Sequence, residues 1–386
     1  MSHQHAAPAP LGGKLLTPTT FICGVLIALM MAILLVRFLF GLGAVTNLND
    51  GFPWGIWVVV DVIIGSAFAC GGFSVAMLVY IFNKGQYHPL VRPALLGSLF
   101  GYTLAGAGVM FDLGRWWNFW HIFSPWHANP NSVMFEVALC ISAYILVMWI
   151  EFSPAFLEKW GKTEVKQKLN KVLFFFIALG TLLPMMHQSS LGTLLVVMGQ
   201  QVNPLWQTPI VPALYLMTAI CMGYAVVLFE SCLTSAVYRA DMEVHLLKPL
   251  AKVMLGVLAV FLAVRIGDLV LRGALGHAFQ FSIEAICFWI EMIGFITPLV
   301  LLHSVTMRRN PRNLFVAAIA LLVGGVFLRL NGFLIGYNTG PGWTYFPSLS
   351  EILVTAGIFA LEVLGYIVIT RRFPVLSPRE GAAATH

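Results

Sequence analysis

The chain has 386 residues, of which 59% are hydrophobic and only 10% are charged, whereas soluble domains hold about 25% charged residues. This composition excludes a soluble globular protein and predicts a polytopic, all-α integral membrane protein. The formal net charge of +6 does not indicate a nucleic-acid partner, because the basic residues lie in short loops between apolar runs and not on one soluble face.

Ten apolar runs predict ten membrane-spanning helices. An even number of crossings places both termini on one side of the membrane. The Lys and Arg residues lie in the tails and loops of that side, except Arg37, Arg115, Arg265, Arg272 and Arg329, so both tails are predicted to be cytoplasmic. The predicted spans are residues 20–42, 54–82, 92–115, 131–152, 170–188, 209–232, 250–272, 282–304, 312–334 and 351–370, within a membrane domain 20–370 between the tails 1–19 and 371–386.

The second run contains the stretch GFPWGIWVVVDVIIGSAFACGG at residues 51–72 and carries a carboxylate, Asp61. An ionised carboxylate inside a bilayer costs roughly 2.5–3.5 kcal/mol, so it needs either a partner or a function. At helical spacing Asp61 shares its face with Gly65, Ala69 and Gly72, which let another backbone or a flat ligand come close. Two interpretations stay open: a functional site, or a carboxylate paired with a neighbouring Arg.

A weak internal repeat links the two halves of the chain. Asp112 and Arg115 end the third predicted helix, and Asp268 and Arg272 end the seventh. An offset of four helices preserves orientation, which predicts a parallel repeat of two four-helix bundles with flanking helices. The bundles would cover residues 54–188 and 209–334.

Ionisable residues within the predicted spans concentrate toward the outer side. Their combined insertion cost requires that they face one another or water, and they therefore predict an internal polar cavity. The set is Asp61, Asp112, Arg115, Glu136, His187, Arg265, Asp268, Glu284, Glu291 and Arg329.

Four residues suggest proton transfer. Glu136 and His187 are predicted to lie at the same depth, and a carboxylate beside an imidazole can pass protons near neutral pH. Tyr102 adds a hydroxyl on a glycine-rich helix. Glu230, near the cytoplasmic end of the sixth helix, could begin a proton route toward that group. Each residue alone is equally compatible with a structural role, and the grouping carries the hypothesis.

Histidine and cysteine positions predict that the chain binds neither haem nor metal. A bis-histidine haem needs two intramembrane histidines at similar depth, whereas His187 and His303 lie in predicted helices at opposite faces. No Cys-x-x-Cys-His motif is present, and no Cys-x-x-Cys spacing occurs. We therefore predict no haem, no iron–sulfur cluster and no metal ligands in this chain.

Several stretches resemble the membrane subunits of hydrogenase-2-type [NiFe] uptake hydrogenases, within the NrfD/polysulfide-reductase membrane-subunit family. The resemblance implies a haem-free, quinone-reactive membrane anchor of the bacterial inner membrane, in contact with membrane lipid. It implies a ferredoxin-like iron–sulfur subunit on the periplasmic face and the large and small [NiFe] hydrogenase subunits as partners. The stretches are residues 51–72, KGQYHPLVRPALLGSLFGY (84–102), FDLGRWWN (111–118), NSVMFEVALC (131–140), LPMMHQSSLG (183–192) and NPLWQ (203–207).

The resemblance places the quinone site in the first bundle near the outer face. Electrons would arrive from the iron–sulfur partner and reduce menaquinone, with protons drawn from the cytoplasm, which would make turnover electrogenic. Another family complex with a different partner, a proton-coupled transporter and a passive anchor remain alternatives. The quinone pocket is predicted at Asp61, Asp112, Arg115, Glu136 and His187, and proton transfer at Tyr102, Glu136, His187 and Glu230.

Overall fold

The computed structural model describes residues 8–52, 54–238 and 244–376, which form helices and no β-strand. Ten segments of this described part are long and apolar enough to cross a membrane. The predicted all-α, ten-span membrane fold is confirmed. Residues 1–7 and 377–386 of the predicted tails, together with Pro53, lie outside the described residues.

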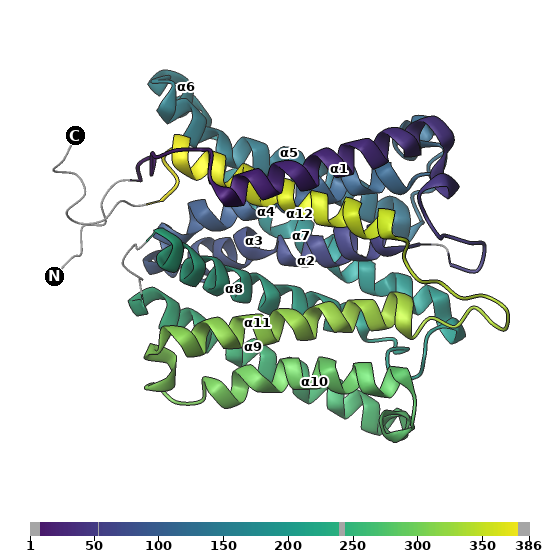
Figure 1. The fold of residues 1–386 in the computed structure, drawn as a ribbon. Helices are drawn as coiled ribbons and strands as arrows, with labels where there is room; N and C mark the ends of the chain where they lie inside the picture. The colour runs from purple at the N-terminus through teal and green to yellow at the C-terminus, as the bar shows by residue number, and fades with distance from the viewer. Residues whose placement is uncertain (1–7, 53, 239–243, 377–386) are drawn as a thin grey trace.

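Four spans pack as the first bundle, which lies in the upper half of Figure 1 behind α1 and α12. The first of these four is the second span of the chain, which is divided into η2 (Trp57–Ile64), α2 (Gly65–Phe68), α3 (Gly71–Ala76) and η3 (Met77–Ile81). The others are α4 (His88–Asp112), α5 (Val133–Lys159) and α7 (Leu173–Met198), with the short helix α6 (Thr163–Asn170) between α5 and α7.

The second bundle, in green in Figure 1, contains α8 (Val211–Tyr238), α9 (Val244–Leu271), α10 (Ile283–Leu301) and α11 (Pro311–Leu330). Helix α8 also packs against α3 and α7 and so joins the two bundles. Helices α1 (Pro18–Phe40) and α12 (Leu349–Arg372) pack together, and α12 covers α4. The Ala9 amide bonds to the Leu376 carbonyl at 3.0 Å, so both terminal segments lie at the same end of the molecule.

The second span is the least regular. Two π-helical segments, η2 and η3, flank short α-helical turns, and the α-helix is interrupted at Ala69 and Cys70. The Gly72 amide donates to Ser98 Oγ of α4 at 2.7 Å, and Ser74 Oγ donates to the Ile220 carbonyl of α8 at 3.3 Å. Helix α4 therefore contacts the backbone of this span directly, and the span's Ser74 side chain contacts the backbone of α8. π-Helical segments frequently mark functional sites.

Close backbone contact also joins α10 to α11, and it leads to a stability prediction. A Cβ atom at Gly294 would lie 2.6 Å from the Gly324 Cα atom, so Gly294→Ala forces the two backbones apart. We expect a loss of about 1–3 kcal/mol, as for other overpacked sites, measured as a lower thermal unfolding midpoint in detergent. Gly267→Ala is the matched control, because a Cβ there meets no heavy atom within 4 Å. Equal midpoints for the two variants would contradict the prediction.

Candidate functional site

A buried polar cluster lies inside the first bundle. The Tyr102 hydroxyl of α4 lies 2.9 Å from Nε2 of His187 on α7. Gln188 Nε2 donates to Ser66 Oγ of α2 at 2.9 Å, and Cys70 Sγ lies 3.5 Å from the Tyr102 hydroxyl. All five side chains are buried. The second span, α4 and α7 thus bring hydroxyl, imidazole, amide and thiol groups together within an apolar core.

The partners of His187 assign its tautomer. Its Nδ1 lies 3.0 Å from the Leu183 carbonyl oxygen, which can only accept a hydrogen bond, so Nδ1 carries a proton. In the neutral imidazole Nε2 is then an acceptor, to which the Tyr102 hydroxyl at 2.9 Å and the Gln188 amide nitrogen at 3.1 Å can both donate. This geometry is ready for proton transfer, because Nε2 can take the hydroxyl proton along a bond that already exists.

Arg329 of α11 brings a positive charge from the second bundle to this cluster. It is fully buried; Nη2 donates to Gln188 Oε1 at 3.3 Å and Nη1 donates to Thr218 Oγ1 at 3.4 Å. Its guanidinium lies 4.9 Å from the centre of the Tyr215 ring. No carboxylate of the described residues forms an ion pair with it, and its Nε has no hydrogen-bond partner there. Arg329 therefore imposes an uncompensated positive potential on the cluster.

Sequence reasoning placed Arg329 in the buried charged set but gave it no role. A signal was present, because residues 311–335 contain no Asp or Glu that could pair with it along its own helix. In contrast, Arg265 of α9 pairs with Glu291 of α10 at 3.3 Å, and Asp268 pairs with Arg272 at 2.7 Å.

Asp61 lies in η2, on the outer side of the central cluster. It is 4% exposed; Oδ2 accepts a hydrogen bond from Thr355 Oγ1 of α12 at 3.2 Å, whereas Oδ1 has no partner in the described structure. Gly108 of α4 makes room for it, since a Cβ there would lie 3.3 Å from the Asp61 Cβ. Asp112 lies one helical turn beyond Gly108. Asp61 of η2 therefore packs against α4 one helical turn before Asp112, so both carboxylates lie along the contact between η2 and α4.

Two arginines from the outer ends of neighbouring predicted helices, Arg37 and Arg115, could have been the partner of Asp61, but neither pairs with it in the structure. Arg37 is buried and donates to the carbonyl oxygens of Phe111 and Leu113, where it caps the end of α4. Arg115 is exposed in the following loop and forms no ion pair with Asp112 in the described residues. The interpretation of Asp61 as the partner of an arginine is therefore wrong, and Arg115 lies apart from the buried cluster.

A second buried carboxylate at the outer end is fully satisfied. Glu351, the third residue of α12, accepts from the Asn47 amide at 2.9 Å and from the Tyr345 hydroxyl at 2.6 Å. Burial, together with the hydrogen bond to Glu351, raises the pKa of Tyr345 above its ordinary value, so this hydroxyl remains a donor. Glu351 thus anchors the outer loops, whereas Asp61 keeps one carboxylate oxygen without a partner in the described structure.

Glu136 and His187 do not lie at the same depth. Helix α7 continues to Met198, ten residues beyond the predicted end, because Ser189 and Ser190 donate back to the Met186 carbonyl and Gln188 bonds to α2. His187 is therefore in the middle of its span, whereas Glu136 is the fourth residue of α5. Helical rise separates their depths by on the order of 10 Å, and the predicted carboxylate–imidazole contact is wrong.

Glu230 of α8 lies on the inner side of the cluster. A Cβ at Gly97 of α4 would lie 2.6 Å from Glu230 Oε1, so the carboxylate packs against the α4 backbone. Gly97 precedes Tyr102 by five residues, about 7 Å along the helix. Glu230 is therefore closer to the end of the molecule that carries the termini than Tyr102 is.

The sequence matches the protein family described as "Polysulphide reductase, NrfD" over residues 44–341. It is 45% identical over 381 residues to the "Probable Ni/Fe-hydrogenase 2 b-type cytochrome subunit" of Escherichia coli K12, covering 98% of this chain and 96% of that protein. Over 158 residues it is 33% identical to the menaquinone reductase integral membrane subunit of Nitratidesulfovibrio vulgaris Hildenborough, and this match covers 39% of the chain and 37% of that protein. An Hdr-like menaquinol oxidoreductase integral membrane subunit of Archaeoglobus fulgidus is 23% identical over 360 residues, and this match covers 86% of the chain and 87% of that protein.

The name of the E. coli relative corrects one prediction. That protein is called a b-type cytochrome subunit, which contradicts the expectation of a haem-free chain. The described residues do not, however, fit a bis-histidine haem. His187 is their one fully buried histidine, and both of its ring nitrogens are hydrogen-bonded. His303 is exposed, and no three His, Cys, Asp or Glu residues of the described part gather around a common point.

Proposed function

This chain belongs to the NrfD (polysulphide reductase) family, and from that premise we propose that it is the quinone-reactive membrane subunit of a [NiFe] hydrogenase complex in the bacterial inner membrane. The names of its relatives, a hydrogenase 2 subunit and a menaquinone reductase subunit, support this proposal. Its partners are an iron–sulfur subunit on the outer face, which delivers electrons, and the large and small hydrogenase subunits.

The observation that carries the proposal is the Tyr102–His187 hydrogen bond inside the bundle. Reduction of menaquinone consumes two electrons and two protons, and a membrane interior supplies protons only through side chains or water. The Tyr102–His187 pair can relay these protons one at a time, because Tyr102 can give its hydroxyl proton to His187 Nε2 and then be reprotonated from the cytoplasmic side before the second transfer. Buried tyrosine and imidazole groups in contact suit this chemistry better than a structural role, which an apolar pair would fill at lower desolvation cost.

The proposed quinone site lies between this pair and the outer face. Asp61, with a carboxylate oxygen that lacks a partner, and Asp112 line its outer side. Arg115 and Glu136 lie near the outer end, where they serve quinone access or partner docking. Arg329 contributes positive potential beside Gln188, which favours the arrival of negative charge as the quinone is reduced.

Protons reach the pair from the cytoplasmic side in this proposal, with Glu230 on that side of Tyr102. Hydrogen oxidation by the partner releases protons outside, so proton uptake from the inside makes turnover electrogenic. A voltage-sensitive dye in liposomes that contain the complete complex should report a membrane potential during quinone reduction. Quinone reduction without a potential would overturn the proton route but not the quinone chemistry.

The decisive experiment purifies the chain with its natural partners and supplies hydrogen and a menaquinone analogue. We expect an iron–sulfur subunit to co-purify and the analogue to be reduced, while an artificial dye accepts electrons directly from the hydrogenase subunits. Dye reduction without quinone reduction would contradict the proposal. Uptake of a polar solute coupled to protons would favour the transporter alternative.

A further inference from the structure

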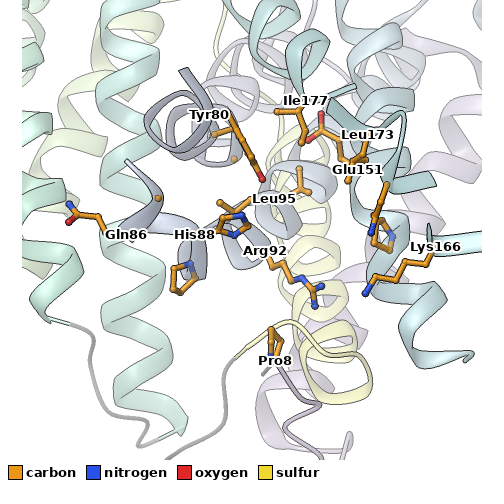
Figure 2. A pocket seen from close by; sticks show the side chains of 17 residues that line it. Pro8, Tyr80, Gln86, His88, Arg92, Leu95, Glu151, Lys166, Leu173 and Ile177 are labelled. Atoms are coloured by element: carbon orange, nitrogen blue, oxygen red, sulfur yellow. The ribbon is translucent and has the colours of Figure 1, made fainter. Parts of the chain in front are cut away.

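A cavity of about 660 Å³ opens at the end of the molecule that carries both terminal segments. Figure 2 shows side chains of η3, α4, α5, α6 and α7 around it. Gln86, His88 and Asn170 at its mouth are exposed, whereas Gly72 and Leu95 at its inner end are buried. Its wall is mostly apolar, but Gln86, His88, Arg92, Glu151, Lys166 and Asn170 contribute polar groups, and a space of this volume with several polar groups can hold water molecules. It therefore forms a wet path from the predicted cytoplasmic side into the first bundle.

The charges at the mouth are paired with one another. Glu158 of α5 binds Arg92 of α4 at 2.7 Å and Lys166 of α6 at 2.5 Å. Arg92 also donates to the Pro374 carbonyl at 3.1 Å, which fastens the C-terminal segment to the mouth. These ion pairs hold three helices and a terminal segment around the opening and keep it polar. Among the described residues at the mouth, His88 is the one ionisable side chain outside these ion pairs.

Glu151 of α5, unlike the paired charges at the mouth, has no counter-charge among the described residues. It lines the same cavity two helical turns deeper than Glu158, about 10 Å along the helix. Its Oε1 is buried and has no hydrogen-bond partner in the described structure. No ion pair within the described residues involves it. Tyr80 of η3 and Glu151 both line the cavity and lie toward its inner end in Figure 2.

The backbone of α7 is adapted to this carboxylate. A Cβ atom at Gly180 would overlap Glu151 Oε1, so the glycine provides the space in which the carboxylate lies. α7 otherwise contributes only the apolar residues Leu173 and Ile177 to the cavity wall. A carboxylate held without a cation at this depth is costly, which marks it as a candidate functional group.

Glu151 also lies on the helix face that leads to the central pair. Tyr144 is seven residues further out on α5, on the same face. The Tyr144 ring packs edge-on against Tyr102 with centroids 4.6 Å apart, and Tyr102 bonds to His187. α5 thus carries one ionisable group at the wet cavity and another at the proposed quinone-reducing cluster.

We propose that this cavity is the proton-uptake chamber of the chain and that Glu151 is the residue that takes protons from it. The inference rests on the proposed quinone reductase function and names an inner proton acceptor in addition to Glu230. Each turnover transfers two electrons from the iron–sulfur partner to menaquinone. The two protons that complete the quinol come from cavity water and pass through Glu151 toward Tyr144 and Tyr102.

The test uses the complete complex in liposomes with hydrogen and a menaquinone analogue. Glu151→Gln should lower quinone reduction by about 100-fold or more, the lower end of the range for a lost proton-transfer group, with dye-linked hydrogen oxidation unchanged. Glu151→Asp should retain part of the activity. Glu164→Gln is the matched control, because Glu164 is exposed on α6 and does not line the cavity; it should match the wild type.

A second readout separates proton transfer from a structural role. Glu151→Ala leaves space for a small weak acid, so formate added on the cytoplasmic side should restore quinone reduction. The lack of rescue by both formate and aspartate would overturn the proposal, as would wild-type turnover in Glu151→Gln. A wild-type complex that reduces no quinone would instead overturn the proposed function.

If Glu151→Gln fails to assemble, chemical labelling of the wild-type complex decides. A water-soluble carbodiimide reacts with protonated carboxyl groups that water can reach. Added to inverted membrane vesicles, it should modify Glu151, as detected by peptide mass spectrometry, and should slow quinone reduction. An unmodified Glu151 under conditions that modify exposed Glu164 would overturn the proposal.

Discussion

Tyr102→Phe is expected to lower hydrogen-driven menaquinone reduction by about 100-fold or more, the lower range for a lost general acid–base group. The substitution removes the hydroxyl that lies 2.9 Å from His187 Nε2 and 3.5 Å from Cys70 Sγ. It keeps the ring that packs against Tyr144. The measurement is the initial rate with a menaquinone analogue, compared with dye-linked hydrogen oxidation by the same preparation, which should be unchanged.

Two further variants test whether the Tyr102–His187 pair transfers protons. His187→Gln keeps a hydrogen-bonding group beside Tyr102 but cannot take up a proton near neutral pH, so it should lose as much quinone-linked activity as Tyr102→Phe. Tyr224→Phe removes the same hydroxyl from a buried tyrosine of α8 that takes no part in the cluster, and it should resemble the wild type. Full quinone reduction by Tyr102→Phe would exclude the pair from proton transfer. Loss of dye-linked activity as well would indicate failed assembly.

The fold follows from hydropathy because each span must satisfy its own backbone in lipid. Apolar runs therefore predicted ten helices, and the repeat pattern predicted two bundles with flanking helices. The end of the fifth span was predicted at residue 188, whereas α7 continues to Met198. The cause is the polar sequence Gln188, Ser189 and Ser190, which resembles the end of a helix. In the structure their hydrogen bonds stay inside the bundle. A hydropathy scale treats them as exposed to lipid and so stops the helix too early.

The candidate site could be predicted only in part. Tyr102 and His187 come together as members of one predicted group, whereas Glu136 and Arg115 lie apart from them. Contacts between bundles were beyond sequence reasoning, because nothing in local spacing relates Arg329 of α11 to Gln188 of α7. Glu151 was also missed. It lies near the predicted cytoplasmic end of its helix, and only the cavity and the space at Gly180 distinguish it.

Two buried arginines of the second bundle are expected to respond in opposite ways to substitution by Met. Arg265→Met leaves Glu291 fully buried without its cation, although Trp206 and Asn331 still donate to its Oε2 at 2.8 and 3.0 Å. Breaking a buried pair on one side costs about 3–5 kcal/mol. We therefore expect a markedly lower unfolding midpoint in detergent and less assembled complex. Replacing Glu291 as well, in Arg265→Met/Glu291→Met, should recover much of the loss, because no orphan charge remains.

Arg329→Met removes a cation that has no carboxylate partner in the described residues, so it leaves no orphan charge. The main cost is one unsatisfied Gln188 oxygen, about 1–3 kcal/mol, besides the weaker contacts with Thr218 Oγ1 and the Tyr215 ring, and relief of the buried charge offsets it. We expect an unfolding midpoint equal to or above that of the wild type, with quinone-linked turnover strongly reduced. Because stability and activity change in opposite directions, this variant separates function from structure. Destabilisation as large as that of Arg265→Met, with quinone reduction intact in the surviving complex, would instead make Arg329 a structural cation.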